Sequence, residues 1–517
     1  MRYICTAWMV ALAACGGGGD SLSDYTLTLT PRVIDGQDPF AGSATVKLWV
    51  QAPGEEPVVT FVGGADGSTE MTEQPPIATG SRVGLVVEAN GADDGSWSPA
   101  ALQAWGATEV DEELGKGTGE VTLTVLVPAA YQVGAMDRLT DARSSFHTAA
   151  AMLPSGDVLL FGGARYHDLS GEESDRILRL TDVNNGDWSF TPVGTKLPDA
   201  LAGRSATMVE VEGRPMVFVA GGGVRLGDTY SNTELSQWAG LYDPENDAWY
   251  WDKAKALPDG FAEHRAVAMA NGNVLIVGRH PVLVMEAALF AVFDPDTQKI
   301  VADGTLDGLG SLGIMAAPLG LDGALVCGGA LIQDRDFTQP VAPVDACVRV
   351  DLQGSVRSAD SLPQPTAWGS MVGLADGSVL LTGGLHQPAM QFESAAASGQ
   401  ALRYANGKWK DTAQSLKLPR THHVSVPMFD GGAMVIGGTG RGGVFRGDAF
   451  DRVQCAERFD PASESFKQVG CDGAGANAQP AVAWAAGRGA FVLEGWHNDE
   501  GSAEGGKLYG WIGGGPE

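Results

Sequence analysis

The sequence predicts an all-β protein built mainly from a β-propeller, and three observations support this fold class. A short apolar run that ends in paired glycines returns about every 50 to 60 residues, which is typical of repeated four-stranded blades. Aromatic residues recur downstream of these pairs. Glycine accounts for 72 of the 517 residues, as expected where tight turns join many short strands.

The repeated apolar run is the strongest of these signals. Its clean copies end in Gly162-Gly163, Gly221-Gly222, Gly328-Gly329, Gly383-Gly384 and Gly437-Gly438. Two more runs, at residues 274–279 and 490–495, lack a clean pair. Seven runs favour seven blades, and six blades are the alternative. We expect the strand that closes the ring either near residues 131–133 or at residues 509–511.

The first residues of the chain predict a targeting segment. Met1 to Tyr3 is short and basic, residues 4–11 are apolar but too short to span a membrane, and small residues precede Cys15. This arrangement resembles the signal of a bacterial lipoprotein, which would occupy residues 1–14. The resemblance implies cleavage before Cys15 and lipidation of its sulfur. An ordinary secretory signal is the alternative.

The residues after the signal predict a linker and a second domain. Residues 15–24 comprise the lipidated cysteine and a Gly-rich linker. In residues 25–130, segments of alternating apolar and polar residues are broken by Gly, Pro and Asp clusters, which is typical of an immunoglobulin-like β-sandwich. This sandwich is interpreted as a spacer, with an adhesion or carbohydrate-binding module as the alternative. The propeller then occupies residues 131–517.

Two further features indicate the kind of propeller. Leu-Pro precedes several apolar runs, as at Leu197 and Pro198, and an aromatic-Asp-Pro motif follows some of them, as at Tyr242. A second aromatic residue, such as Trp249, comes next. With the glycine pairs, these features resemble the kelch family over roughly residues 143–511. The resemblance implies blades of four antiparallel strands, and the family includes both binding proteins and enzymes.

The charge balance limits the class of partner. The chain carries 34 basic and 63 acidic residues, which gives a formal net charge of −29. Such acidity repels nucleic-acid phosphates and anionic lipid surfaces. We therefore expect no nucleic-acid partner, and contact with a membrane only through the lipid anchor.

Histidines and arginines recur at one rim of the predicted propeller. Because strands alternate in direction, the start of a first strand and the end of a second strand lie at the same rim. The candidate ligand-binding face at this rim comprises Arg143, His147, His167, Arg204, His264, Arg265, His386, Arg420, His422 and His423. The structural interpretation is favoured: the histidines pack between strands, and the arginines bond to carbonyls of neighbouring blades.

The alternative hypothesis is that a divalent metal ion binds at this histidine-bearing rim. Carboxylates such as Asp168 and Asp334 stand in the long connections there, and imidazole with carboxylate suits divalent ions. No metal-ligand spacing such as His-Glu-x-x-His appears in the sequence. We therefore assign no cofactor and no metal ligands.

Four cysteines of the propeller stand at the same rim. Cys327 ends one predicted strand and Cys347 begins the next, while Cys455 and Cys471 join neighbouring strands. An exported chain favours disulfides at such positions. We expect the pairs Cys327 with Cys347 and Cys455 with Cys471, and buried free thiols are the alternative.

The function that follows is binding, with no catalytic residues assigned. We expect a lipid-anchored protein of the outer membrane or cell surface that binds an envelope protein or a polysaccharide through the rim described above. A carbohydrate-active enzyme of the oxidase or epimerase type, and a structural envelope component, are the alternatives. The copper radical oxidases among kelch-like enzymes need a free cysteine crosslinked to tyrosine, and the propeller cysteines are expected to be paired.

Overall fold

The computed structural model describes the chain as strands and the connections between them. The described residues are 8–10, 25–29, 32–33, 44–51, 58–64, 69–71, 82–89, 102–109, 117–121, 124–125, 131–133, 148–153, 157–163, 174–181, 189–201, 203–223, 235–279, 288–331, 342–387, 396–428, 432–440, 453, 455–469, 481–485, 489–493 and 508–511. Within these ranges the one helical element is a 3-10 turn, η2 (Gly320–Asp322). The all-β class is confirmed.

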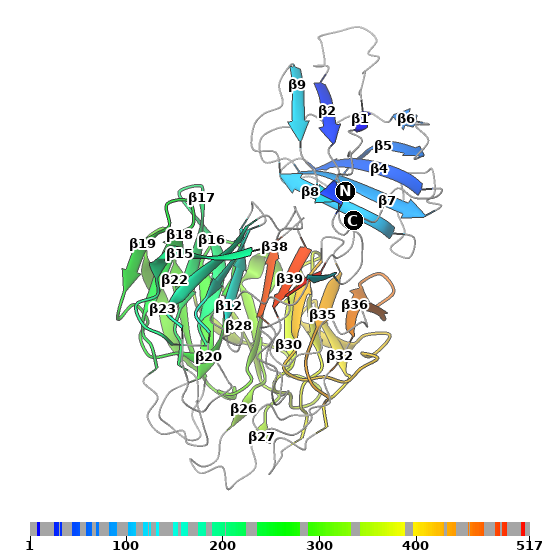
Figure 1. Cartoon of the computed structure of the whole chain (residues 1–517). Coiled ribbons are helices and arrows are strands. Elements are labelled where there is room, and N and C mark those ends of the chain that lie inside the picture. The colour runs from blue at the N-terminus through cyan, green and yellow to red at the C-terminus, as the bar shows by residue number, and fades with distance from the viewer. Residues whose placement is uncertain are drawn as a thin grey trace, which may run out of the picture.

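Residues 131–511 form seven four-stranded antiparallel sheets (Figure 1). The first contains β12 (Ala149–Met152), β13 (Val158–Phe161), β14 (Arg176–Thr181) and β15 (Ser189–Lys196). The second contains β16 (Ser205–Val211), β17 (Arg214–Ala220), β18 (Ala239–Asp243) and β19 (Ala248–Lys253). The third contains β20 (Ala262–Ala268), β21 (Val274–Arg279), β22 (Ala288–Asp294) and β23 (Lys299–Leu306).

The remaining propeller sheets follow the same order. The fourth contains β24 (Met315–Pro318), β25 (Ala324–Cys327), β28 (Cys347–Val350) and β29 (Val356–Ser358), with β26 (Ala330–Leu331) and β27 (Ala342–Pro343) as an inserted hairpin. The fifth contains β30 (Ser370–Gly373), β31 (Val379–Thr382), β32 (Ala401–Ala405) and β33 (Lys408–Asp411). The sixth contains β34 (Val424–Pro427), β35 (Ala433–Ile436), β36 (Ala456–Asp460) and β37 (Ser465–Val469).

The seventh sheet joins distant parts of the chain. It contains β38 (Ala481–Ala485), β39 (Gly489–Leu493), β40 (Leu508–Trp511) and β11 (Tyr131–Val133). β11 pairs antiparallel with β40, so that Tyr131 lies opposite Gly510. Both segments that the sequence offered as the closing strand therefore belong to this sheet. The first strands contact one another from sheet to sheet, and β12 also contacts β38.

The described residues before β11 form three smaller sheets. β1 (Trp8–Val10), β2 (Tyr25–Leu29) and β9 (Gly117–Val121) form one, and β3 (Arg32–Val33) pairs in parallel with β10 (Thr124–Val125). A five-stranded sheet contains β6 (Thr69–Met71), β5 (Val58–Gly64), β4 (Ala44–Gln51), β7 (Arg82–Ala89) and β8 (Leu102–Glu109). β1 falls within the expected signal segment, where it pairs antiparallel with β2.

The second strands of the first to sixth sheets are mostly buried on both faces. All four residues are buried in β13, β25, β31 and β35. A strand with a neighbouring sheet on each side reads as a continuous apolar run rather than an alternating one. By contrast, β23 near the outside alternates between exposed and half-buried residues. Burial between sheets therefore explains the repeated apolar runs of the sequence.

The recurring aromatic residues face each other across the third and fourth strands. The pairs are Tyr242 with Trp249, Tyr404 with Trp409, and Phe459 with Phe466, with ring centroids 5.5, 5.1 and 5.0 Å apart. Tyr242 also packs edge-to-face on Phe161 of the preceding sheet, at 5.8 Å. Such aromatic pairs add to the free energy gained by burial, and here one pair spans the boundary between two sheets.

The glycine pairs stand at the ends of second strands, and the segment that leads to the next sheet passes close to them. Gly328 and Gly329 both have a positive φ, 66° and 84°. The Gly329 N–H donates to the Thr366 carbonyl, which lies in the connection to the next sheet, at 3.0 Å. A Cβ on Gly328 would lie 2.1 Å from the same carbonyl oxygen. Only glycine combines this backbone conformation with so close an approach.

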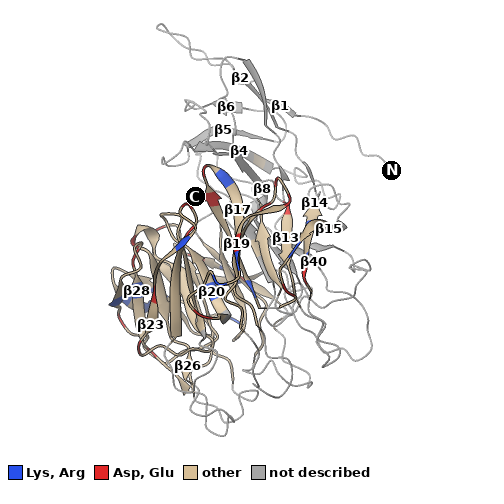
Figure 2. Cartoon of the chain, turned by 90° about the vertical axis from the view of Figure 1, so that its left-hand side faces the viewer, with Lys and Arg blue, Asp and Glu red and all other residues tan. Residues whose placement is uncertain are grey.

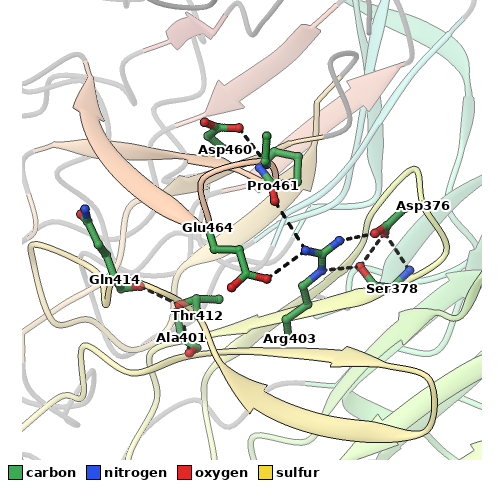
Figure 3. A network of polar contacts seen from close by, with 10 residues as sticks. Asp376, Ser378, Ala401, Arg403, Thr412, Gln414, Asp460, Pro461 and Glu464 are labelled. Carbon is green, nitrogen blue, oxygen red and sulfur yellow. Dashed lines mark hydrogen bonds and ion pairs between the residues drawn. The ribbon is translucent and has the colours of Figure 1, made fainter.

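Arginines join neighbouring sheets at the rim where first strands turn tightly into second strands, and Figure 3 shows one of them, Arg403. Arg403 of β32 donates to Ser378 and forms an ion pair with Asp376 in its own sheet. The same guanidinium pairs with Glu464 of the sixth sheet at 3.0 Å and reaches the Pro461 carbonyl. Arg179 of β14 repeats this arrangement with Asp157 and with the carbonyl of Pro244. The aromatic-Asp-Pro motif thus supplies a carbonyl acceptor to the preceding sheet.

Candidate functional site

The two rims of the propeller differ in the length of their connections. At one rim the strands turn tightly, as at residues 212–213 between β16 and β17. At the other rim residues 328–346 separate β25 from β28, residues 383–400 separate β31 from β32, and residues 437–455 separate β35 from β36. We call these the short-turn rim and the long-connection rim. Figure 1 places β26 at the end of the propeller remote from β4 and β5.

A disulfide closes one of the long connections of this rim. Cys327 and Cys347 lie opposite each other on β25 and β28 and form a disulfide across a sequence separation of 20 residues. This expected pair is confirmed. Cys455 is likewise disulfide-bonded, and its expected partner, Cys471, lies outside the described residues. The hairpin β26–β27 is therefore covalently tied at its base.

Two of the candidate arginines are engaged inside the propeller. Arg204 and Arg420 each lie 17 residues before the first glycine of the pair in their own sheet, and each donates through Nη1 to that glycine's carbonyl. The distances are 2.6 Å to Gly221 and 3.0 Å to Gly437. Arg204 also pairs with Asp199 and lies over the Trp238 ring, 5.0 Å from its centroid. Both arginines bond to main-chain carbonyls, as the structural interpretation expected, but these carbonyls belong to their own sheet and not to a neighbouring one.

Arg420 has an additional buried partner that the sequence did not reveal. Its Nη2 lies 2.7 Å from Oε1 of Glu457, and both side chains are fully buried. The Glu457 carboxylate also accepts the main-chain N–H groups of Lys417 and Leu418, at 2.7 and 3.0 Å. Burial lowers the pKa of Arg420, against the opposing effect of the Glu457 charge. Arg420 therefore holds a connection in place rather than facing a ligand.

Two of the candidate histidines lie buried between adjacent sheets. Nε2 of His264 lies 2.8 Å from Ser205 Oγ, and Nε2 of His423 lies 2.9 Å from Thr382 Oγ1. Burial, together with nearby arginines, lowers the pKa of His264 to about 3. Burial also holds the pKa of His423 well below its usual value. These two imidazoles are neutral and act as connectors between sheets.

His422 differs from its neighbour His423. Its backbone has a positive φ of 54°, and the equivalent residue of the fifth sheet, Trp368, has a φ of 55°. The two rings lie 5.9 Å apart with an interplanar angle of 32°. Main-chain hydrogen bonds connect the fourth, fifth and sixth sheets here. The Trp368 N–H donates to the Gly313 carbonyl, and the His422 N–H donates to the Trp368 carbonyl. His422 Nδ1 lies 3.0 Å from Thr421 Oγ1.

An apolar layer supports this ring pair. Bridges join Leu312 to Ala330 and Ala367 to Leu385, and these four residues cluster with Trp368. The equivalent bridge of the sixth sheet joins Thr421 to Thr439. In each case the first-strand and second-strand hairpin is extended beyond the glycine pair, toward the long-connection rim. The layer places the two rings on a dry, well-packed base.

The other candidate residues are dispersed. His386, which follows Leu385, is half-buried, and burial lowers its pKa. Its buried Nε2 has no hydrogen-bond partner among the described residues. Arg265 on β20 is exposed. Arg143, His147, His167 and Cys15 lie outside the described residues. No group of three or more His, Cys, Asp or Glu in the described ranges could hold a metal ion.

Trp368 is the residue of this site that the sequence analysis did not identify. A signal was present, because Trp368 stands as many residues before the glycine pair of its sheet as His422 does. A positive φ is unusual for tryptophan, so residue type alone did not point to it. Comparing the repeats position by position would have placed Gly313, Trp368 and His422 together.

The distribution of charge and the search for membrane-spanning helices add two observations. In Figure 2, lysines and arginines are scattered among acidic residues over the described sheets, with no continuous basic stripe in that part of the chain. The absence of a nucleic-acid partner stays a prediction. In the described ranges, no helix has the length and apolar character needed to cross a bilayer.

Comparison with solved structures supports the fold alone. A fungal alcohol oxidase of the AA5 family, in complex with copper, superposes with a TM-score of 0.51 at 15% identity, over 71% of this chain and 74% of that one. YjhT gives 0.43 at 15% identity, over 63% and 97%. Virginiamycin B lyase from Staphylococcus aureus, with quinupristin, gives 0.42 at 12% identity, over 71% and 96%.

These neighbours are propeller-like. No protein-family model matches the sequence, and no curated protein matches it.

Proposed function

We propose that this protein is an exported recognition protein that binds its ligand at the long-connection rim. The observation that carries the proposal is the contrast between the two rims. Short turns and inter-sheet arginine contacts tie one rim together, while the other bears the long connections, one of them held by the Cys327–Cys347 disulfide. Long loops on a rigid scaffold are the usual location of binding sites.

The architecture behind this proposal is a single closed ring. The seven four-stranded sheets would be seven blades of the kelch type, closed by β11 on β40. The contact of β12 with β38 supports closure. The strands of residues 25–130 would form an immunoglobulin-like spacer. Because β4 and β5 lie remote from β26 in Figure 1, this spacer would leave the long-connection rim facing outward.

The proposed location is the outer membrane or cell surface, with a lipid on Cys15. The disulfides are compatible with export, because such bonds persist in oxidising compartments. The test is metabolic labelling with a tritiated fatty acid, followed by a high-salt wash of the membranes. Wild-type protein should be labelled and retained, and Cys15→Ala should be neither. Retention of Cys15→Ala in washed membranes would reject the anchor.

The proposed partners are an envelope protein or a polysaccharide. The full chain in detergent should be tested for binding to immobilised polysaccharides and to solubilised envelope proteins. Replacing residues 388–395 by a Gly-Ser segment of equal length should reduce binding. Leu321→Ser, at an 82% exposed residue of the short-turn rim, should not. Equal binding by wild type and the loop variant would reject the long-connection rim as the binding surface.

An enzyme remains the weaker candidate. The copper-bound fungal oxidase raises the question of a copper site here. The described donors do not fit one: Cys327, Cys347 and Cys455 are in disulfides, and His264 and His423 bond to Ser205 and Thr382 between sheets. We therefore assign no catalytic step to these residues.

A further inference from the structure

Asparagine followed by glycine occurs four times in the chain, and two of these dipeptides lie in described turns. One is Asn271 with Gly272, between β20 and β21, and the other is Asn406 with Gly407, between β32 and β33. The dipeptides that begin at positions 90 and 185 lie outside the described residues. Both described dipeptides follow an alanine, so their intrinsic reactivity should be nearly the same.

An asparagine that precedes glycine is open to an internal reaction. The main-chain nitrogen of the glycine loses its proton to solvent and bonds to the side-chain carbonyl carbon of the asparagine, and the amide nitrogen leaves as ammonia. The cyclic imide then takes up one water, which breaks one imide C–N bond and gives aspartate or isoaspartate. Glycine favours this attack because it has no side chain to hinder the approach. Hydrogen bonds to the reacting groups oppose it, since they must first be broken.

Three hydrogen bonds restrain the dipeptide between β20 and β21. The Gly272 N–H donates to the Met269 carbonyl at 2.9 Å. The Asn271 amide donates to the Leu352 carbonyl, in the turn between β28 and β29, at 3.1 Å, and it accepts the Asn273 N–H at 3.2 Å. The attacking nitrogen and the group that it would attack are therefore both held, although both residues are exposed.

The dipeptide between β32 and β33 has no such restraint. Ala405 lies opposite Lys408, so Asn406 and Gly407 alone make the turn. Their φ values of 52° and 77° are typical of a type I′ turn. Both residues are exposed, and apart from its chain neighbours nothing lies within 4 Å of a Cβ built on Gly407. Neither the Asn406 amide nor the Gly407 N–H has a hydrogen-bond partner among the described residues.

We propose that Asn406 is a site of spontaneous deamidation through attack by the Gly407 nitrogen, and that Asn271 is protected from the same reaction. The two sites share their dipeptide, the preceding alanine and an exposed position, so the hydrogen bonds of the fold make the difference. Water is the co-reactant and ammonia is the leaving group. The modification is independent of the ligand proposed above.

The product should weaken the contact between the fourth and fifth sheets. Lys408 follows the dipeptide and pairs at 2.6 Å with Asp360, which lies in the connection between these sheets. The Trp409 N–H donates to the same carboxylate at 3.2 Å, and the Trp409 ring packs on Tyr404. Isoaspartate adds a methylene to the main chain at position 406, and a two-residue turn sets the register of its strands. We therefore expect β33 to lose its register with β32.

The test follows both sites by peptide mass mapping while the full chain is kept in a mildly alkaline buffer. In the folded protein, Asn406 should be converted about tenfold faster than Asn271, or more. Isoaspartate should appear together with aspartate, because opening of the imide gives both. In concentrated urea the two sites should react at similar rates, because the hydrogen bonds that restrain Asn271 are then lost.

Three results would overturn the proposal. The first is conversion of Asn271 in the folded protein as fast as, or faster than, that of Asn406. The second is an Asn406 that stays intact in the folded protein while the unfolded chain reacts. The third is aspartate without isoaspartate, which would indicate direct hydrolysis of the amide by water instead of attack by Gly407.

Asn406→Gly tests the structural consequence, with Asn271→Gly as the matched control. Glycine keeps the two-residue turn, since it adopts a positive φ readily, and it removes the reactive amide. Each protein is compared with its own sample before incubation. Wild type and Asn271→Gly should show a lower midpoint of thermal unfolding after incubation, and Asn406→Gly should not. An equal fall in Asn406→Gly would reject the expected weakening of the contact between the two sheets.

Discussion

Arg420 and Glu457 form an ion pair in which neither side chain has exposed surface, with Nη2 of Arg420 2.7 Å from Oε1 of Glu457. The arginine also donates to the carbonyls of Gly437 and Cys455, and the carboxylate accepts two main-chain N–H groups. Burial of two charges is tolerated only with such complete hydrogen bonding. The pair fixes the connection between the fifth and sixth sheets to β36.

Removing one charge of this pair should destabilise the protein strongly. Glu457→Gln leaves the Arg420 charge buried, and breaking a buried pair in this way costs roughly 3–5 kcal/mol. The measurement is the free energy of unfolding in urea. Arg349→Met is the control, because Arg349 and Asp322 form an exposed pair, and such pairs contribute about 1 kcal/mol or less. Similar small losses for both variants would contradict the prediction.

The glycine pairs should differ from turn glycines in their tolerance of alanine. Gly328→Ala and Gly213→Ala both place alanine at a positive φ, which costs about 1 kcal/mol. At Gly213 the new Cβ meets nothing within 4 Å, whereas at Gly328 it meets the Thr366 carbonyl oxygen at 2.1 Å. We expect Gly328→Ala to lose roughly 3 kcal/mol or more of unfolding free energy. Equal losses in a urea titration would disprove a close-approach role.

Stability should fall in acid because His264 is buried in its neutral form. Its pKa in the folded state is about 3, below the ordinary histidine value of 6.5, so the unfolded chain binds the extra proton first. The stabilisation is complete above pH 6.5 and is lost as the pH falls toward 3, by about 1.4 kcal/mol per pH unit.

Replacement of His264 by an uncharged residue checks this explanation. His264→Gln should show a shallower decline of unfolding free energy between pH 6.5 and 4 than the wild type. Some decline should remain, because His423 is also buried with a lowered pKa. An unchanged slope would mean that His264 takes up its proton in the folded state as well.

The disulfide at the base of the β26–β27 hairpin should contribute to stability. For a sequence separation of 20 residues, loss of the crosslink is expected to cost about 3 kcal/mol. Cys327→Ala together with Cys347→Ala, compared with wild type under oxidising conditions, isolates this bond from the one formed by Cys455. Unfolding midpoints that coincide would show that the native contacts alone hold the connection.

Much of the fold was predictable because its signals have local physical causes. The pair at Gly328 and Gly329 requires a positive φ and close backbone approach, so glycine pairs recur at the ends of five of the seven apolar runs. Tyr242 and Trp249 recur because they face each other across two strands. The pairing of β11 with β40 has no such local signature, since it joins residues from distant parts of the chain.

The site was less predictable than the fold. The sequence analysis treated His422 and His423 alike. They are adjacent in sequence, but His423 lies between two sheets, whereas His422 lies beside Trp368. Arg420 lies just before β34, and its partner Glu457 lies in β36 of the same sheet. The local sequence around either residue does not predict this ion pair.

The pairing of β11 with β40 also sets the order of events in biosynthesis. β11 emerges from the ribosome early and must wait for the last strand before the seventh sheet can be completed. During that interval the edge of β11 that pairs with β40 has no partner in the sheet. Because the two strands are far apart in sequence, their pairing is a non-local step that we expect to form late in folding.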